Sequence, residues 1–361
     1  MKVIQLIDSL DAGGAERVAV NIANALALKT EGSFLCTTRK EGILKNSLND
    51  DVGYMFLKKV NALDIFAIKR LSKFVRKHKI DVIHAHSTSF FLATIVKWLH
   101  PTLRIVWHDH YGNSEYLNSR KSNILKFCSK YISHIICVND ALKLWNKKKL
   151  QCNNVIYLPN FAVQDKVDAK TKLKGVSGKR ILHLANLRPQ KDHKTLFLAF
   201  KKVLEKFPDW SLHCVGKDFS DEYSKKIRLV ISKLQLVDSV FFYDSKEDVS
   251  NIISQSDIGV LSSKSEGLPI SLLEYGLFGL PVIATNVGDC KKVITIESES
   301  GILVEKENPK ALASAIKTVI SDKTKARLLG NNLKLRITNE FSEKAYIKSL
   351  LDIYRQKSEK G

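Results

Sequence analysis

Two glutamates, Glu266 and Glu274, stand eight positions apart in the stretch SSKSEGLPISLLEYGLFGLPVIATNVG. A strand is predicted to run into the loop that holds Glu266 and Gly267, and Pro269 then opens a helix, since proline is tolerated in a first helical turn. The first amides of a helix lack backbone partners and lie at the positive end of its dipole, so they favour a phosphate group. Because Glu266 precedes the helix, one carboxylate could approach a sugar while the other reaches a ribose. Two glutamates at this spacing are common on solvated helices, and the strand–turn–helix setting is what favours a binding site.

Two further turns hold residues suited to a nucleotide diphosphate. In HLANLRPQKDH a strand ends and a helix begins, and Arg188 and Lys191 could bind phosphate there, the arginine as a planar fork and the lysine as a point charge. The alternative is that both are solvated loop side chains. In DAGGAER, Gly13 and Gly14 lie between the first strand and the first helix, where glycine lets a backbone approach a ligand closely. Their spacing does not match the dinucleotide fingerprint G-x-G-x-x-G.

Four histidines, His84, His86, His108 and His110, fall at the ends of strand-like segments. Alternate residues on a strand point the same way, so the two histidines of each pair could bind one metal ion together. Neither pair comes with a clear third ligand, however. We therefore predict no metal site. A single histidine that hydrogen-bonds to a substrate at a cleft edge is the favoured interpretation. The chain also lacks the serine-hydrolase elbow and the Walker A sequence.

Short Val- and Ile-rich runs alternate with helical patterns along the chain, as in buried parallel strands connected by helices. The first series of strand-like runs lies at 2–7, 33–38, 81–86, 104–108, 134–139 and 154–160, and the second at 179–185, 210–216, 239–243, 258–263 and 281–285. Two series predict two doubly wound α/β domains, with the ligand between them at the carboxyl ends of the strands. The predicted segments are 1–165, 166–340 and a final helical segment, 341–361.

Composition excludes several classes of protein. A chain of 361 residues with 44% hydrophobic residues and no low-complexity block is neither disordered nor fibrous. Its six cysteines form no C-x-x-C pair, which is typical of a reducing compartment. Gln5 and Asp8 interrupt the first apolar run, so it is no signal peptide, and the apolar run 90–99 is too short to span a bilayer. We expect a cytoplasmic protein, or one peripheral to the inner face of the cell membrane.

The formal net charge is +21, and one predicted helix, residues 65–79, holds a dense run of six lysines and arginines. Apolar residues at helical spacing (Ile68, Leu71, Phe74 and Val75) leave a face of lysine and arginine. This face could simply be solvated, or it could contact an anionic membrane surface. Nucleic acid is not a predicted partner, because no RNA-binding or zinc-finger signature accompanies the charge.

Together these residues resemble the family 4 glycosyltransferases, retaining enzymes whose GT-B fold has two Rossmann-like domains and an interdomain cleft. The stretch EGLPISLLE matches the family's E-x7-E motif. The resemblance implies that Glu266 lies near the transferring sugar and that Glu274 hydrogen-bonds to the nucleotide ribose. It further implies that the amides of Gly267 and Leu268 face the donor phosphates, and that Lys191 binds them.

The resemblance extends to other residues of both domains. It implies that the Gly13–Gly14 loop closes against the donor and that His110 contacts the sugar, with His108 as the alternative register. The family usually has arginine five residues before the phosphate-binding lysine, where this chain has Asn186, and Arg188 is the candidate substitute. The final helix of the family commonly crosses back to the first domain.

The function implied is retaining transfer of a sugar from a nucleotide sugar, with UDP favoured, to a hydroxyl of a lipid-linked or membrane-associated glycan. Relatives of this kind build capsular polysaccharide, exopolysaccharide or lipopolysaccharide. No metal cofactor is expected, because Lys191, Arg188 and helix amides would stabilise the leaving diphosphate. The alternatives are a nucleotide-sugar epimerase of the same fold and a non-catalytic polysaccharide-assembly subunit.

Overall fold

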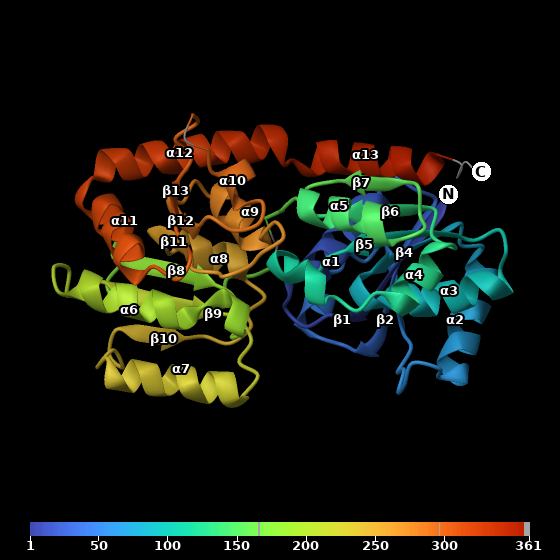
Figure 1. Cartoon of the computed structure of the whole chain (residues 1–361), viewed down its shortest axis with the longest axis horizontal. Helices are drawn as coiled ribbons and strands as arrows, with labels where there is room; N and C mark the ends of the chain where they lie inside the picture. Colours follow the sequence, from blue (N-terminus) through green and yellow to red (C-terminus); the bar gives the residue numbers. More distant parts are fainter. Residues whose placement is uncertain (165–166, 296, 357–361) are drawn as a thin grey trace. The chain divides into compact units, whose positions relative to one another are not determined.

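The computed structural model describes residues 1–164, 167–295 and 297–356. Within these ranges the chain forms two compact units (Figure 1). The first comprises Met1–Phe161 and the segment that starts at Glu343, and the second comprises Ala162–Ser342. The domain boundary predicted between residues 165 and 166 falls on two residues outside the described ranges, as does the end of the predicted final segment, 357–361.

Seven parallel strands form the sheet of the first unit, in the order β3-β2-β1-β4-β5-β6-β7. They are β1 (Lys2–Ser9), β2 (Gly32–Lys40), β3 (Val52–Phe56), β4 (Val82–His86), β5 (Arg104–Asp109), β6 (His134–Cys137) and β7 (Val155–Tyr157). The helices are α1 (Gly14–Ala27), α2 (Ile65–His78), α3 (Phe90–Leu99), α4 (Asn123–Ser129), α5 (Asp140–Lys149) and α13 (Glu343–Arg355), with 3₁₀ turns η1 (Ile43–Ser47), η2 (Ser87–Ser89) and η3 (Ser114–Ser119). The strand order reverses between β1 and β4, a switch point beside which folds of this kind bind their ligands.

Helices pack on both faces of this sheet. On one face Ile83 joins a core with Leu71 of α2 and Leu92 of α3, and on the other Ile7 packs with Val20 of α1. Side chains alternate between the faces of a strand, so the neighbours of these apolar residues point the opposite way. The sheet face that α1 covers therefore also carries a row of buried polar side chains from β1, β4 and β5. We call this the polar row; its members are Gln5, His84, His86 and His108.

The last helix, α13, packs on the first unit although it follows the second unit in the sequence (Figure 1). Its buried side chains recur at helical spacing, as expected of an amphipathic helix. The phenol of Tyr354 hydrogen-bonds to Nδ1 of His84 at 2.6 Å, and the ring of Tyr346 lies 4.4 Å from that of Phe161. This helix therefore covers part of the polar row.

The sheet of the second unit has six parallel strands in the order β10-β9-β8-β11-β12-β13. They are β8 (Arg180–Leu184), β9 (Ser211–Val215), β10 (Val240–Phe242), β11 (Ile258–Leu261), β12 (Val282–Thr285) and β13 (Ile302–Val304). The helices are α6 (His193–Leu204), α7 (Glu222–Lys233), α8 (Val249–Ser254), α9 (Ile270–Leu277), α10 (Cys290–Val293), α11 (Pro309–Ser321) and α12 (Lys323–Glu340), with a 3₁₀ turn, η4 (Pro189–Lys191).

The two predicted series of parallel strands are confirmed, with differences at their ends. The sequence analysis missed β3 and β13, which lie at the edges of their sheets. Gly53 interrupts the apolar pattern of β3, and β13 has only three residues, so neither shows a long Val- or Ile-rich run. None of the helices in the described ranges combines the length and apolarity that crossing a bilayer requires.

Candidate functional site

Lys191 and Glu266 form an ion pair in the second unit. Lys191 ends η4, which follows β8, and Glu266 lies in the loop between β11 and α9; β8 and β11 are neighbours in the sheet. The distance from Lys191 Nζ to Glu266 Oε1 is 2.5 Å, and the Ser263 hydroxyl donates to the same oxygen at 2.6 Å. The side chain of Glu266 is 8% exposed and that of Lys191 is 22% exposed. The pair places a cation and a carboxylate side by side at the carboxyl end of the sheet, where water screens them only in part.

A glycine holds the backbone of the Glu266 loop in place. Gly288 has a φ of +53°, and a Cβ atom there would lie 2.3 Å from the carbonyl oxygen of Glu266 and 2.5 Å from that of Gly267. The amide of Asp289 donates to the Gly267 carbonyl at 2.9 Å. Both the left-handed backbone and the close approach require glycine at position 288. The Glu266 loop is therefore held in place by the segment that follows α9 and β12.

Helix α9 carries Glu274 and is anchored to the sheet by its neighbour Tyr275. The phenol oxygen of Tyr275 accepts from the Leu184 amide at 2.7 Å and donates to the Leu182 carbonyl at 3.2 Å. Glu274 is buried, with 8% of the residue exposed. Pro269, predicted to open the helix, is its N-cap. Glu266 thus precedes the helix and Glu274 lies within it, as the spacing predicts.

Arg188 is not part of the Lys191–Glu266 pair. It is exposed, and its guanidinium lies over the ring of Phe219, 4.2 Å from the ring centre. The side chain of Asn186 accepts a hydrogen bond from the Lys217 amide at 2.8 Å, which gives it a structural contact between two loops. Whether Arg188 takes the place of the family arginine stays a prediction.

In the first unit, Gly13 and Gly14 lie where the chain leaves β1 and enters α1. Gly13 is the N-cap of α1 with extended backbone, and Gly14 is exposed. The atoms nearest to a Cβ atom on Gly13 would be those of the Glu16 carboxylate, a flexible group that can move. Internal packing thus does not account for glycine at position 13, and close approach of a ligand stays the prediction for this loop.

The two candidate histidines after β4 and β5 differ in exposure. His108 is completely buried, whereas His110 is partly exposed. Their rings lie 3.9 Å apart, and Nε2 of His110 is 3.0 Å from Nδ1 of His86. Burial lowers the pKa of His108 well below its usual range and lowers the pKa of His110 to about 3, so both rings are neutral near pH 7. Of the two, His110 is the ring that a substrate can reach.

His84, His86 and His108 bring ring nitrogens within 4.8 Å of one another, a grouping compatible with a metal ion. His86 has no nitrogen to offer, however. Its Nε2 is 2.9 Å from Gln5 Oε1, and its Nδ1 is engaged with His110. Since each imidazole must present a lone pair to a metal, binding would break one of these hydrogen bonds. The cluster is better described as a group of neutral, buried rings: His84 and His86 are hydrogen-bonded to Tyr354, Gln5 and His110, whereas His108 contacts its neighbours through its ring faces.

The sequence analysis missed the groups that support the His110 segment. Arg120 forms two hydrogen bonds with the Asp109 carboxylate, at 2.7 and 2.9 Å, and Asn146 donates to the same carboxylate at 2.8 Å. The guanidinium also lies 4.4 Å from the ring of Tyr111 and 4.6 Å from that of Trp145. Asp109 is 1% exposed. The only sign of these groups in the sequence was Asp109, an acidic residue at the end of a predicted buried strand.

Two family models match this chain and together cover most of it. Residues 12–162 match Glycosyltransferase Family 4, and residues 165–336 match Glycosyl transferases group 1. An uncharacterized glycosyltransferase of Haemophilus influenzae is 26% identical over 321 residues, which cover 86% of this chain and 88% of the relative. The UDP-Gal:alpha-D-GlcNAc-diphosphoundecaprenol alpha-1,3-galactosyltransferase of Escherichia coli is 25% identical over 345 residues, 88% of this chain and 87% of the relative.

Solved structures show the same fold. The crystal structure of Anabaena Alr3699/HepE in complex with UDP and glucose superimposes with a TM-score of 0.78 at 18% identity, over 98% of both chains. At this identity the likeness concerns the architecture, which is that of two parallel Rossmann-like sheets.

Proposed function

The chain belongs to the family 4 (group 1) glycosyltransferases, enzymes of the GT-B fold that use nucleotide-sugar donors, and on that premise we propose a specific reaction. It transfers a hexose from a UDP-sugar to a hydroxyl group of a lipid-linked glycan, with retention at the anomeric carbon. Support for UDP comes from the E. coli relative, named for UDP-Gal, and from the Anabaena structure, which holds UDP. The same relative is named for a diphosphoundecaprenol-linked acceptor, which supports a lipid-linked one here.

The observation that carries the donor half of this proposal is the Lys191–Glu266 pair. In the reaction the bond between the anomeric carbon and the β-phosphate oxygen breaks, and the acceptor oxygen forms the new bond to that carbon. The acceptor proton passes to the leaving diphosphate. Lys191 and the amides of Gly267 and Leu268 would stabilise the negative charge on the diphosphate, and the Glu266 carboxylate would face the positive charge on the sugar ring. Arg188 would add a second cation, Gly13 and Gly14 would admit the donor, and His110 would hydrogen-bond to the sugar.

Glu274 is proposed to bind the ribose, and its replacement gives a test of donor binding. We expect UDP-hexoses to raise the melting temperature of the wild type more than GDP- or ADP-hexoses, because a ligand stabilises the state that binds it. Glu274→Ala is expected to bind the UDP-hexose roughly 10- to 150-fold more weakly, since a hydrogen bond to a charged group contributes about 1.5–3 kcal/mol. Titration calorimetry with UDP-galactose and UDP-glucose measures this loss.

The control is Glu222→Ala, which removes an exposed carboxylate from α7 and should leave donor affinity unchanged. Unaltered affinity in Glu274→Ala would refute the ribose contact. Interconversion of UDP-glucose and UDP-galactose without release of UDP would instead identify an epimerase.

The acceptor half of the proposal rests on the surface formed by α2 and the loop before it. Residues 57–79 hold eight lysines or arginines and one acidic residue. Beside this charge four apolar side chains protrude with exposed fractions of 82, 64, 63 and 73%, namely Val60, Leu63, Ile65 and Phe66. Apolar side chains next to lysines and arginines are what a peripheral protein presents to an anionic bilayer, the former entering the interface and the latter binding headgroups. We call Val60, Leu63, Ile65 and Phe66 the apolar tip.

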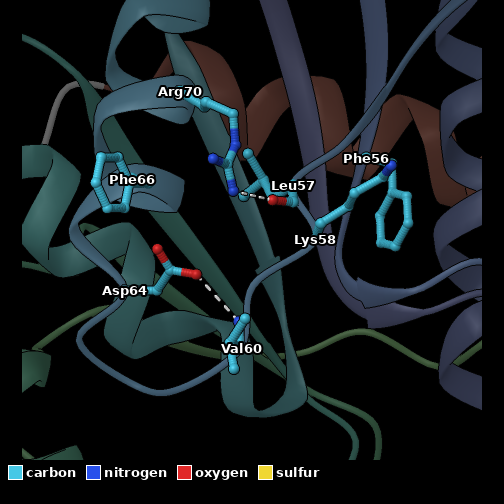
Figure 2. Close-up of a pocket in the computed structure, with 7 residues that line it drawn as sticks. All are labelled: Phe56, Leu57, Lys58, Val60, Asp64, Phe66 and Arg70. Atoms are coloured by element: carbon cyan, nitrogen blue, oxygen red, sulfur yellow. Dashed lines mark hydrogen bonds between the residues drawn. The ribbon is translucent and has the colours of Figure 1, made fainter.

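A pocket of about 530 Å³ opens at the base of the apolar tip (Figure 2). Figure 2 shows Phe66 and Val60 among its lining residues, with the Arg70 guanidinium donating to the Leu57 carbonyl and the Asp64 carboxylate accepting from the Val60 amide. These two hydrogen bonds tie the loop backbone at Leu57 and Val60 to α2 and to its N-cap, Asp64. The geometry supports binding to a lipid surface at this end of the first unit.

Membrane binding is tested by flotation with vesicles. We expect the protein to float with vesicles that contain phosphatidylglycerol and not with phosphatidylcholine alone, and less so at high salt, because salt screens the attraction. Phe66→Ser should weaken flotation several-fold, while Leu229→Ser, which changes another exposed apolar residue, on α7, should not. Binding that ignores lipid charge, or an unaffected Phe66→Ser variant, would contradict the proposal.

A further inference from the structure

A row of hydrogen bonds runs through the buried polar face of the first unit and ends at His110. The amide oxygen of Gln5, on β1, lies 2.9 Å from His86 Nε2, and His86 Nδ1 lies 3.0 Å from His110 Nε2. Gln5 and His86 are both completely buried, whereas His110 is partly exposed. The row therefore connects the interior of the sheet to a ring at its surface.

The chemistry of these atoms sets the direction of each hydrogen bond. An amide oxygen only accepts, so Nε2 of His86 must carry a proton. Burial lowers the pKa of His86 well below its usual range, so the ring is neutral and its Nδ1 has only a lone pair. That lone pair accepts, and Nε2 of His110 must therefore donate. Because the His110 ring is neutral too, its Nδ1 is left as an acceptor.

We propose that His86, held by Gln5, is a positioning residue that fixes His110 in the Nε2-protonated form, so that Nδ1 of His110 accepts a hydrogen bond from a hydroxyl group of the transferred sugar. This inference rests on the proposed function, in which His110 contacts the sugar. It adds that the contact requires a hydroxyl donor at one position of the sugar, because a sugar that is deoxy at that position offers no proton to Nδ1. His86 itself touches no substrate.

The pair formed by Tyr354 and His84, on the same sheet face, provides a matched control. The Tyr354 phenol hydrogen-bonds to His84 Nδ1 at 2.6 Å, and both residues are completely buried. Neither makes a hydrogen bond with His110 within the part of the chain that the structure describes. Tyr354→Phe removes a buried hydrogen bond of the same kind from the same face. The phenol also interacts with the Gln5 side chain, but it takes no part in the Gln5–His86 and His86–His110 hydrogen bonds themselves.

The protonated nitrogen of each ring is read directly by long-range ¹H–¹⁵N correlation in the full chain labelled with ¹⁵N-histidine, without any substrate. Signals are assigned by loss of one histidine at a time. We expect His110 to be protonated at Nε2 in the wild type and in Tyr354→Phe. His86→Leu should give a mixture of the two neutral forms, whereas His86→Asn, whose amide oxygen can replace Nδ1 as acceptor, should restore the Nε2 form. Protonation of wild-type His110 at Nδ1 would overturn the inference.

Turnover gives the second readout, as UDP release from UDP-galactose, UDP-glucose or UDP-N-acetylglucosamine, whichever is consumed. We expect kcat to fall about tenfold in His86→Leu, with KM changed much less, because one hydrogen bond to the sugar is misdirected while diphosphate contacts persist. His86→Asn and Tyr354→Phe should stay near the wild type. Wild-type kcat in His86→Leu would overturn the inference.

The same experiments separate failure of this inference from failure of the proposed function. If His110→Ala keeps wild-type turnover, the sugar contact assigned to His110 is wrong, whatever the ring's protonation. If His110→Ala loses turnover but the wild-type ring is protonated at Nδ1, the sugar contact stands and control by His86 is wrong. Should His86→Leu fail to fold, the wild-type spectrum and His86→Asn still decide the point.

Discussion

Lys191→Ala is expected to lower turnover of the UDP-sugar by roughly 30- to 1000-fold. The ammonium is the cation proposed to meet the charge that develops on the leaving diphosphate, and one such contact contributes about 2–4 kcal/mol to the transition state. Lys191 also neutralises the Glu266 carboxylate, which accepts from the Ser263 hydroxyl as well. Loss of the lysine therefore leaves an uncompensated negative charge that repels a diphosphate. Both effects act in the same direction.

Steady-state UDP release by Lys191→Ala measures this loss, with Lys194→Ala as the control. Lys194 is exposed in the first turn of α6, three residues further along, so the control removes a lysine from the same region without touching Glu266. Thermal unfolding of both variants shows that the fold is retained. A turnover within threefold of the wild type would refute the role of Lys191 in catalysis.

Arg120→Met is expected to destabilise the first unit by about 3–5 kcal/mol, because it leaves the buried Asp109 carboxylate without its bidentate partner. The Arg120 side chain is 10% exposed and that of Asp109 is 1% exposed, so water cannot replace the lost hydrogen bonds. Asn146 would remain as a donor to Asp109 but carries no charge. Methionine is close to arginine in length, so little packing volume is lost.

Urea unfolding followed by tryptophan fluorescence measures this change in the first unit. Three of the four tryptophans belong to that unit, and two of them, Trp107 and Trp145, lie beside the Arg120 guanidinium. Lys121→Met, at the next and exposed position, should shift the unfolding midpoint little. A loss under about 1 kcal/mol in Arg120→Met would show that the ion pair is not what stabilises the segment after His110.

Local patterns in the sequence were enough to predict the elements that carry the proposed donor site. Short Val- and Ile-rich runs predicted the inner strands of both sheets, and the Glu266–Pro269 turn predicted α9. The spacing of apolar and basic residues predicted a helix over residues 65–79, which ends one residue beyond the observed α2. These features depend on neighbours within one or two turns of helix or one strand, which is the range over which periodicity reports structure. The edge strands β3 and β13 have weaker patterns because fewer of their residues are buried.

The sequence by itself determined that Glu266 and Lys191 lie between a strand end and a helix start, and that Glu274 lies within the helix after Glu266, because strand and helix periods are local. Only the tertiary structure decided that Lys191 meets Glu266 across 75 residues, that Gly288 supports the Glu266 loop, and that Gln5 and His86 reach His110. It also decided that His108 is buried and His110 accessible. These outcomes depend on which strands are neighbours and in what register, and the free energy that selects them comes from burying side chains distant in sequence.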